Sequence, residues 1–174
     1  TAAQNLATDE GIYLKVIRGK TAALFSAATE AGGVIAGASD DVTQALFDYG
    51  DALGIAFQIV DDYLDYAGDT GATGKNLGDD FRERKLTLPV IKAVALADAE
   101  ERTFWARCIE RGKQEEGDLD TALALLARHG TLQATREEAT GWADRAKAAL
   151  APLPAGEMRD MLMDLADYVV ARIR

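Results

Sequence analysis

Residues 57–66 read FQIVDDYLDY and form the most informative stretch of the chain. With 100° assigned to each residue of a helix, four polar side chains share one narrow stripe: Gln58, Asp61, Asp62 and Asp65. Apolar residues fill an arc of roughly 200° on the rest of this helix, about twice the stripe of an ordinary surface helix. Such a helix is surrounded by protein on most sides. Its polar stripe is therefore predicted to face an internal cavity.

The three carboxylates of the stripe, Asp61, Asp62 and Asp65, are candidate ligands of a metal ion. Like charges this close on a helix repel one another, and burial strengthens the repulsion, so we expect a cation to balance them. Magnesium suits the stripe because it takes one or two carboxylates, keeps waters and bridges to substrate phosphates, with manganese as the alternative. Zinc is disfavoured because no histidine or cysteine lies nearby in the sequence. The competing interpretation is an acidic stripe that is merely solvated.

Other acidic residues are interpreted differently. Asp160, Asp164 and Asp167 share one face of a predicted helix whose apolar residues occupy only the opposite side. This pattern is typical of an amphipathic surface helix, so we expect these three carboxylates to be solvated. Asp118 and Asp120 are interpreted as acids in the first turn of a helix, where the helix dipole favours negative charge.

Lys20 lies among apolar residues of the first predicted helix, including Tyr13, Ile17 and Leu24. A lysine on an apolar face is costly unless an anion meets it or its ammonium group reaches water. Two interpretations stay open. Lys20 either extends to solvent, or reaches the same cavity as the aspartates and binds a phosphate, in which case Thr21 adds a hydroxyl.

Helices are predicted along the whole chain, and no segment has the pattern of a strand. Ser39 is the expected N-cap of the aspartate helix, and Pro89 suits the first turn of the next helix. Residues 67–86 are predicted to be a loop whose glycines and cations, among them Lys75 and Lys85, suit a flap over a phosphorylated ligand. The predicted helices cover residues 9–31, 39–66, 89–97, 98–111, 118–129, 131–150 and 155–173.

The composition is that of one globular all-α domain spanning residues 1–174. Of the 174 residues, 48% are hydrophobic and 28% are charged. The net charge of −10 argues against a nucleic-acid partner. Cys108 is the only cysteine, so no intramolecular disulfide can form and we expect a reducing compartment, the cytoplasm. The longest apolar runs are too short to predict a transmembrane segment.

The order of the motifs resembles that of the trans-isoprenyl (polyprenyl) diphosphate synthases. Residues 57–66 resemble the second aspartate-rich motif of that family, and Lys20-Thr21 matches its lysine-threonine pair. Residues 73–80 (TGKNLGDD), with Lys85 and Thr87-Leu88-Pro89, resemble its next block at the expected spacing. An isolated DDxxD motif also occurs in terpene cyclases, whereas the ordered set is specific.

The resemblance implies an isoprenoid-synthase-type helical bundle, usually homodimeric, and a magnesium-dependent prenyltransferase. The enzyme would join isopentenyl diphosphate to an allylic diphosphate by ionisation, condensation and proton loss. Asp61 would ligate magnesium, with Asp62 and Asp65 in or next to that shell. The residues implied to contact the diphosphate or to hold the site closed are Lys20, Thr21, Gln58, Lys75 and Lys85.

The family's first aspartate-rich motif, its arginine pair and its isopentenyl-diphosphate-binding residues have no match in this sequence. We therefore expect the chain to be the C-terminal half of such an enzyme and to be inactive alone. Residues 2–28 resemble the long-chain synthases (octaprenyl, solanesyl and decaprenyl) that make quinone side chains. Two alternatives stay open: a noncatalytic partner subunit of a prenyl synthase, and a class I terpene cyclase, which the Lys85 to Pro89 block disfavours.

Overall fold

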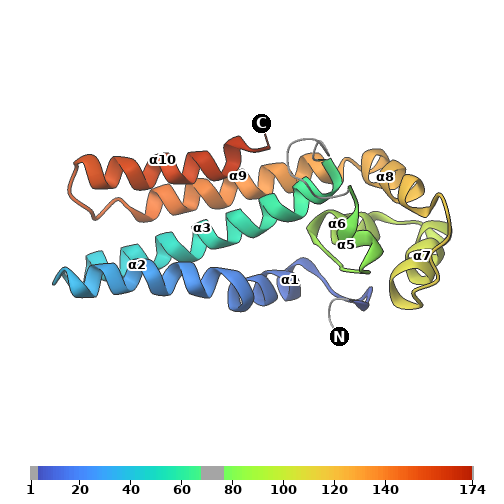
Figure 1. Cartoon of the computed structure of the whole chain (residues 1–174), viewed down its shortest axis with the longest axis horizontal. Helices are drawn as coiled ribbons and strands as arrows, with labels where there is room; N and C mark the ends of the chain where they lie inside the picture. Colours follow the sequence, from blue (N-terminus) through green and yellow to red (C-terminus); the bar gives the residue numbers. More distant parts are fainter. Residues whose placement is uncertain (1–3, 68–76, 174) are drawn as a thin grey trace. The chain divides into compact units, whose positions relative to one another are not determined.

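The computed structural model describes residues 4–67 and 77–173, and this part of the chain is helical without any strand (Figure 1). The all-α prediction is confirmed. The α-helices are α1 (Glu10–Ile17), α2 (Ala23–Ile35), α3 (Asp40–Ala67), α5 (Asp79–Arg82), α6 (Leu88–Leu96), α7 (Ala99–Trp105), α8 (Asp118–Arg128), α9 (Thr131–Ala149) and α10 (Glu157–Ala171). Two π-helical turns, η2 (Arg18–Ala22) and η3 (Ala106–Glu110), continue α1 and α7.

Most predicted boundaries agree with the structure. Helix α3 begins immediately after Ser39, and α6 carries Pro89 in its first turn, as expected. Two differences stand out. The first helical segment continues through Gly32 and Gly33 to Ile35, and the predicted loop contains the short helix α5. Both Gly32 and Gly33 keep negative φ angles, so they extend the helix instead of ending it.

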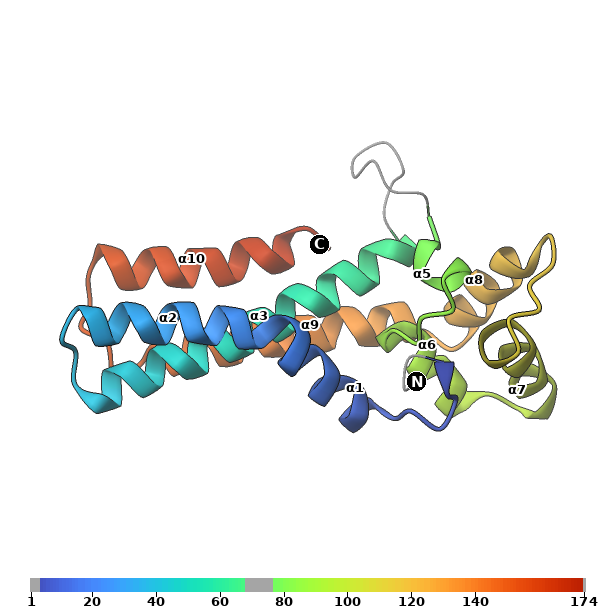
Figure 2. The same cartoon turned by 60° about the horizontal axis from the view of Figure 1, so that its bottom comes forward.

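The chain divides into two compact units. The bundle unit comprises Leu14–Val60 and Glu137–Arg174. Its helices α2, α3, α9 and α10 run lengthwise beside one another (Figures 1 and 2). The Tyr49 hydroxyl donates a hydrogen bond to the Leu162 carbonyl at 2.7 Å, which joins α3 to α10. Lys147 of α9 contacts Asp167 of α10 at 2.8 Å, so the predicted solvated cluster on α10 has one carboxylate in an ion pair.

Helices α2 and α3 pack closely because glycines lie at their contact. A Cβ atom added to Gly54 would lie 2.6 Å from the Ala22 Cα atom. One added to Gly50 would lie 2.6 Å from both the Phe25 carbonyl oxygen and the Ser26 Cα atom. Backbone atoms cannot move aside as a flexible side chain can. Only glycine therefore permits this approach at position 50.

The π-helical turn η2 changes which residues of the first helical segment are buried. Successive buried residues are spaced by four residues in α1, from Tyr13 to Ile17, and then by five, from Ile17 to Ala22. A π-helical turn adds one residue to the turn and so rotates the following helix relative to a 100° projection. The predicted apolar face is therefore wrong beyond Ile17. Leu24, expected on that face, is 76% exposed, and Lys20 is exposed as well.

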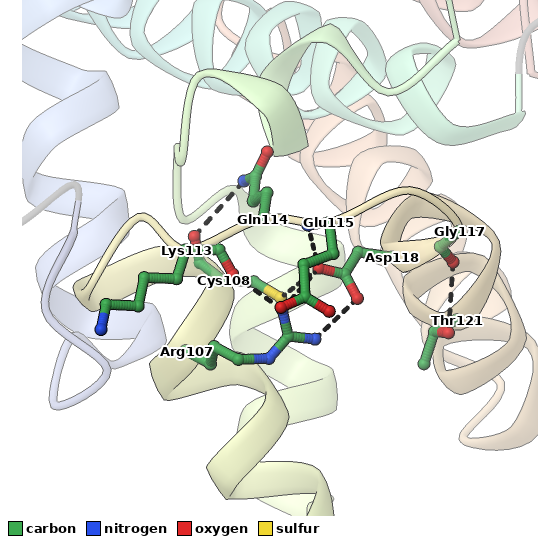
Figure 3. Close-up of polar contacts among 8 residues, drawn as sticks. All are labelled: Arg107, Cys108, Lys113, Gln114, Glu115, Gly117, Asp118 and Thr121. Atoms are coloured by element: carbon green, nitrogen blue, oxygen red, sulfur yellow. Dashed lines mark hydrogen bonds and ion pairs between the residues drawn. The ribbon is translucent and has the colours of Figure 1, made fainter.

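The aspartate unit comprises Thr1–Tyr13 and Asp61–Arg136 and contains α5 to α8. An ion pair in this unit joins η3 to the start of α8, where Arg107 contacts both carboxylate oxygens of Asp118 at 2.8 and 2.6 Å (Figure 3). Asp118 also accepts hydrogen bonds from the Glu115 amide at 2.7 Å and from the Cys108 thiol at 3.4 Å. Asp118 does lie in the first turn of α8, but its carboxylate is buried and organises the preceding loop.

Among residues 4–67 and 77–173, each helix is too short or too polar to span a membrane.

Replacing Gly50 by alanine is expected to destabilise the protein by about 1–3 kcal/mol because the new methyl group meets the α2 backbone. The matched control is Gly141→Ala in α9, where an added Cβ meets nothing within 4 Å. Alanine there is expected to stabilise by about 0.5–1 kcal/mol, since a helix disfavours glycine. Urea denaturation of both variants checks the prediction. Equal effects of the two substitutions would contradict the close packing of α2 on α3.

The Arg107–Asp118 pair predicts a pH dependence of stability. Hydrogen bonds from Arg107 lower the pKa of Asp118 from 3.8 to about 2. Because the folded-state pKa is depressed, this stabilisation is complete above about pH 4 and is lost as the pH falls through about 2. In the Asp118→Asn variant, the free energy of unfolding should change less with pH over this window. Urea denaturation at several pH values measures this dependence. The control Asp120→Asn, at an exposed neighbour, should keep the wild-type slope; an unchanged slope in Asp118→Asn would refute the assignment.

Candidate functional site

The carboxylate row at the C-terminal end of α3 comprises Asp61, Asp62 and Asp65. Asp62 is 3% exposed and Asp65 is 9% exposed, whereas Asp61 is half-buried. Two of the four side chains of the polar stripe are therefore buried, and the internal cavity that the apolar arc predicts stays a prediction. In the preceding turns of α3, Ile55, Ile59 and Val60 are fully buried.

Asp62 is held by a tyrosine from another helix. The hydroxyl of Tyr13 in α1 donates a hydrogen bond to Asp62 Oδ2 at 2.6 Å in a buried environment. Burial, and then the neighbouring Asp62 carboxylate, raise the pKa of Tyr13 well above its usual value of 10. The hydroxyl therefore stays protonated at neutral pH and remains a donor. Sequence reasoning placed Tyr13 only in the core, because nothing in its spacing reveals a partner 49 residues away.

Asp65 joins α3 to the short helix α5. Its carboxylate accepts a hydrogen bond from the Asp80 amide at 3.1 Å, and its carbonyl accepts one from the Gly78 amide at 2.8 Å. Gly78 has φ = 77°, a left-handed conformation that favours glycine. This glycine lets the chain turn back onto α3. The arrangement sets the start of α5 directly against the carboxylate row.

Lys85 follows α5 and is held by two acids. Its ammonium group lies 2.6 Å from Glu83 and 3.0 Å from Asp80. Hydrogen bonds to Glu83 first, and then to Asp80, raise the pKa of Lys85 above its usual value, so the side chain is a cation at all physiological pH values. Since Asp80 also donates its amide to Asp65, one residue connects the predicted metal ligands to the predicted phosphate-binding lysine.

Two further predicted residues meet in the bundle unit. The Thr21 hydroxyl donates a hydrogen bond to Gln58 Oε1 at 2.8 Å. Thr21 and Lys20 both lie in η2, and π-helical turns occur frequently at functional sites. Lys20 is exposed beside this pair, which agrees with the solvent-reaching interpretation of its side chain. Lys75 lies outside the described residues, and the roles of all the predicted site residues stay predictions.

In the described part of the chain, no three or more His, Cys, Asp or Glu side chains come together as a site that could hold a metal ion. A cage made by protein alone is not what magnesium needs, because it takes one or two carboxylates and completes its shell with waters and phosphates. The buried Asp62 and Asp65 already accept hydrogen bonds from Tyr13 and Asp80. Asp61 is half-buried and is the most accessible of the three carboxylates.

A family model described as polyprenyl synthetase matches residues 1–126. The octaprenyl diphosphate synthase of Haemophilus influenzae is 40% identical over 165 residues, which cover 95% of this chain and 50% of that protein.

Solved structures extend the likeness to the fold. The decaprenyl diphosphate synthase from Rhodobacter capsulatus is 70% identical with a TM-score of 0.94, covering 99% of this chain and 53% of that one. A polyprenyl synthase from Caulobacter crescentus, complexed with calcium and isoprenyl diphosphate, is 47% identical with a TM-score of 0.92, covering 98% and 52%. The chain thus spans about half the length of each of these relatives and shares their all-α fold.

Tyr13→Phe is expected to destabilise the protein by about 1–3 kcal/mol, because the buried Asp62 carboxylate loses a hydrogen-bond donor. Chemical denaturation at neutral pH measures the loss. Tyr168→Phe on α10 is the matched control, since Tyr168 is 68% exposed and its substitution should change stability by less than about 0.5 kcal/mol. A Tyr13→Phe variant as stable as the control would show that the hydroxyl does not support Asp62.

Proposed function

The chain belongs to the polyprenyl synthetase family, and on that premise we propose that the protein is a long-chain trans-polyprenyl diphosphate synthase. Its substrates are an allylic diphosphate and isopentenyl diphosphate. The observation that carries the proposal is the link from carboxylates to cation: Asp65 binds the Asp80 amide, and Asp80 binds the Lys85 ammonium group. A site for a diphosphate and a divalent cation needs negative carboxylates for the metal and a positive group for the phosphates close together.

The carboxylate row is proposed to hold magnesium, with manganese as a substitute. Asp61 is the direct ligand, while Asp62 and Asp65 add negative charge beside it and orient α3 through their hydrogen bonds. The Caulobacter crescentus relative, which is complexed with calcium and isoprenyl diphosphate, supports the use of a divalent cation together with a diphosphate. When bound, the metal would neutralise charge that develops on the departing diphosphate.

The cationic and amide side chains are proposed to bind the diphosphate. Lys85, held in its charged form, and Lys20 and Lys75 supply positive charge, while Thr21 and Gln58 supply polar contacts. These groups stabilise the leaving group without transferring a proton, which suits the cleavage of a carbon–oxygen bond to a stable anion. The allylic cation left behind is attacked by the double bond of isopentenyl diphosphate. Loss of a proton from the adduct then removes the positive charge of the carbocation and forms a double bond in place of the one that reacted, so the product is a longer allylic diphosphate.

The remaining assignments rest on relatives and composition. The 40% identity to an octaprenyl synthase and the 70% identity to a decaprenyl synthase support a long-chain product, proposed to become a quinone side chain. The protein is proposed to act as a homodimer in the cytoplasm, where its one cysteine, Cys108, stays reduced.

The test is a condensation assay of the full-length protein with magnesium, isopentenyl diphosphate and an allylic diphosphate primer. Asp61→Ala should lower the rate by about 10²- to 10³-fold, the usual cost of removing one electrostatic element. Asp164→Ala removes an exposed carboxylate of α10 and should leave the rate unchanged. Near-normal turnover by Asp61→Ala, or a cyclised product, would overturn the assignment.

A further inference from the structure

The turn that follows α5 is closed at one carbonyl group. The Phe81 carbonyl accepts the Arg84 amide at 2.9 Å, and the chain then passes through Arg84, whose φ of 60° lies in the left-handed region that residues other than glycine rarely adopt. Lys85 comes next, and its amide returns to the Asp80 carbonyl at 2.8 Å. The place of the Lys85 side chain therefore depends on this strained turn keeping its shape.

Gln114, which is not part of this turn, binds the same Phe81 carbonyl group. Its Nε2 atom donates to the Phe81 carbonyl oxygen at 2.7 Å and to the Cys108 carbonyl oxygen at 3.3 Å. One side-chain amide thus bridges α5 and η3, which are separated by many residues in the sequence. The half-buried carboxamide can satisfy both carbonyls only while the loop that carries it keeps its conformation.

That loop is built around the Arg107–Asp118 pair (Figure 3). Besides contacting Asp118, Arg107 donates to the Lys113 carbonyl at 2.7 Å, and Asp118 accepts the Glu115 amide at 2.7 Å. The residues on both sides of Gln114 are therefore tied by their backbone to one buried ion pair. Charge-assisted hydrogen bonds of this kind are stronger than neutral ones, so the loop is a rigid base for Gln114.

The same region packs against α5 at two further points. A Cβ added to Gly78 would meet the side chain of Leu119, the second residue of α8. One added to Gly112 would lie 3.2 Å from the Arg84 Cδ atom. Residues 112–119 thus contact this region at three points: Gly78 just before α5, the Phe81 carbonyl that closes the turn, and Arg84 with its left-handed backbone.

We propose that Gln114 is a positioning residue for the diphosphate site: through the Phe81 carbonyl it holds the turn that places Lys85 and keeps the Asp80 amide on Asp65. This inference rests on the proposed function for its catalytic consequence, but its structural content stands on hydrogen bonds within the aspartate unit. Gln114 does not touch substrate; it acts through Lys85.

The first experiment measures hydrogen–deuterium exchange in residues 77–86 of the ligand-free protein. Gln114→Glu keeps the shape of the side chain but removes the donor, and Gln114→Met does so without adding charge. Both should exchange the Asp80 and Lys85 amides about tenfold faster than the wild type. Thr121→Ala, which removes a hydrogen bond to the Gly117 carbonyl on the same stretch, should leave the exchange unchanged. Wild-type exchange in both folded Gln114 variants overturns the proposal.

The second experiment measures steady-state kinetics of the full-length protein. Gln114→Met should raise the KM for the allylic diphosphate about three- to tenfold and change kcat by less than about twofold, because a displaced Lys85 weakens diphosphate binding equally in the ground state and the transition state. In a Lys85→Ala background the same substitution should raise KM by less than about twofold, since the residue through which it acts is gone. The full effect persisting in that background refutes action through Lys85.

Failure of this inference and failure of the proposed function are distinguishable. A wild-type protein that transfers no prenyl group would refute the proposed function. Amide exchange would then decide alone whether Gln114 holds the α5 turn: faster exchange in the Gln114 variants supports that hold, and unchanged exchange overturns it.

Discussion

The repulsion among three carboxylates at the C-terminal end of α3 is the constraint on which the site depends. Asp61, Asp62 and Asp65 lie within five residues, two of them are buried, and no basic residue occupies the last turn of this helix. The helix dipole places partial negative charge at the same end, which adds to the cost. A sequence that violates local preference so strongly indicates a position selected for function rather than for stability.

Hydrogen-bond donors from other segments make this arrangement tolerable. Tyr13 meets Asp62, and the Asp80 amide meets Asp65, so the two buried carboxylates are both partnered while Asp61 stays the most accessible of the three. The donors also orient the row. Because the Asp80 side chain binds Lys85, the same contacts that support the acids bring a permanent cation to their side. The same hydrogen bonds therefore support the carboxylate row and bring the residues of the proposed site together.

Much of this could be predicted from local rules, and the failures have physical causes. Helix boundaries followed from caps, prolines and periodicity, and Thr21 and Gln58, predicted for one site, do share a hydrogen bond. The face of the first helical segment was wrong because a projection at 100° per residue assumes unbroken α-helix, whereas η2 inserts a π-helical turn. Asp118 does lie in the first turn of α8, as predicted, but its position in the sequence could not reveal its ion pair with Arg107.

The sequence by itself determined the helical class, the single polar stripe of α3 and the order of motifs, because these depend on spacing along the chain and on side-chain type. Only the tertiary structure decided which donors meet which acceptors: Tyr13 with the Asp62 carboxylate, the Asp80 amide with the Asp65 carboxylate, and Gln114 with the Phe81 carbonyl in the turn before Lys85. These hydrogen bonds join residues 15 to 49 positions apart. Partners at such separations meet only when packing brings their segments together, and periodicity within one segment carries no record of the other.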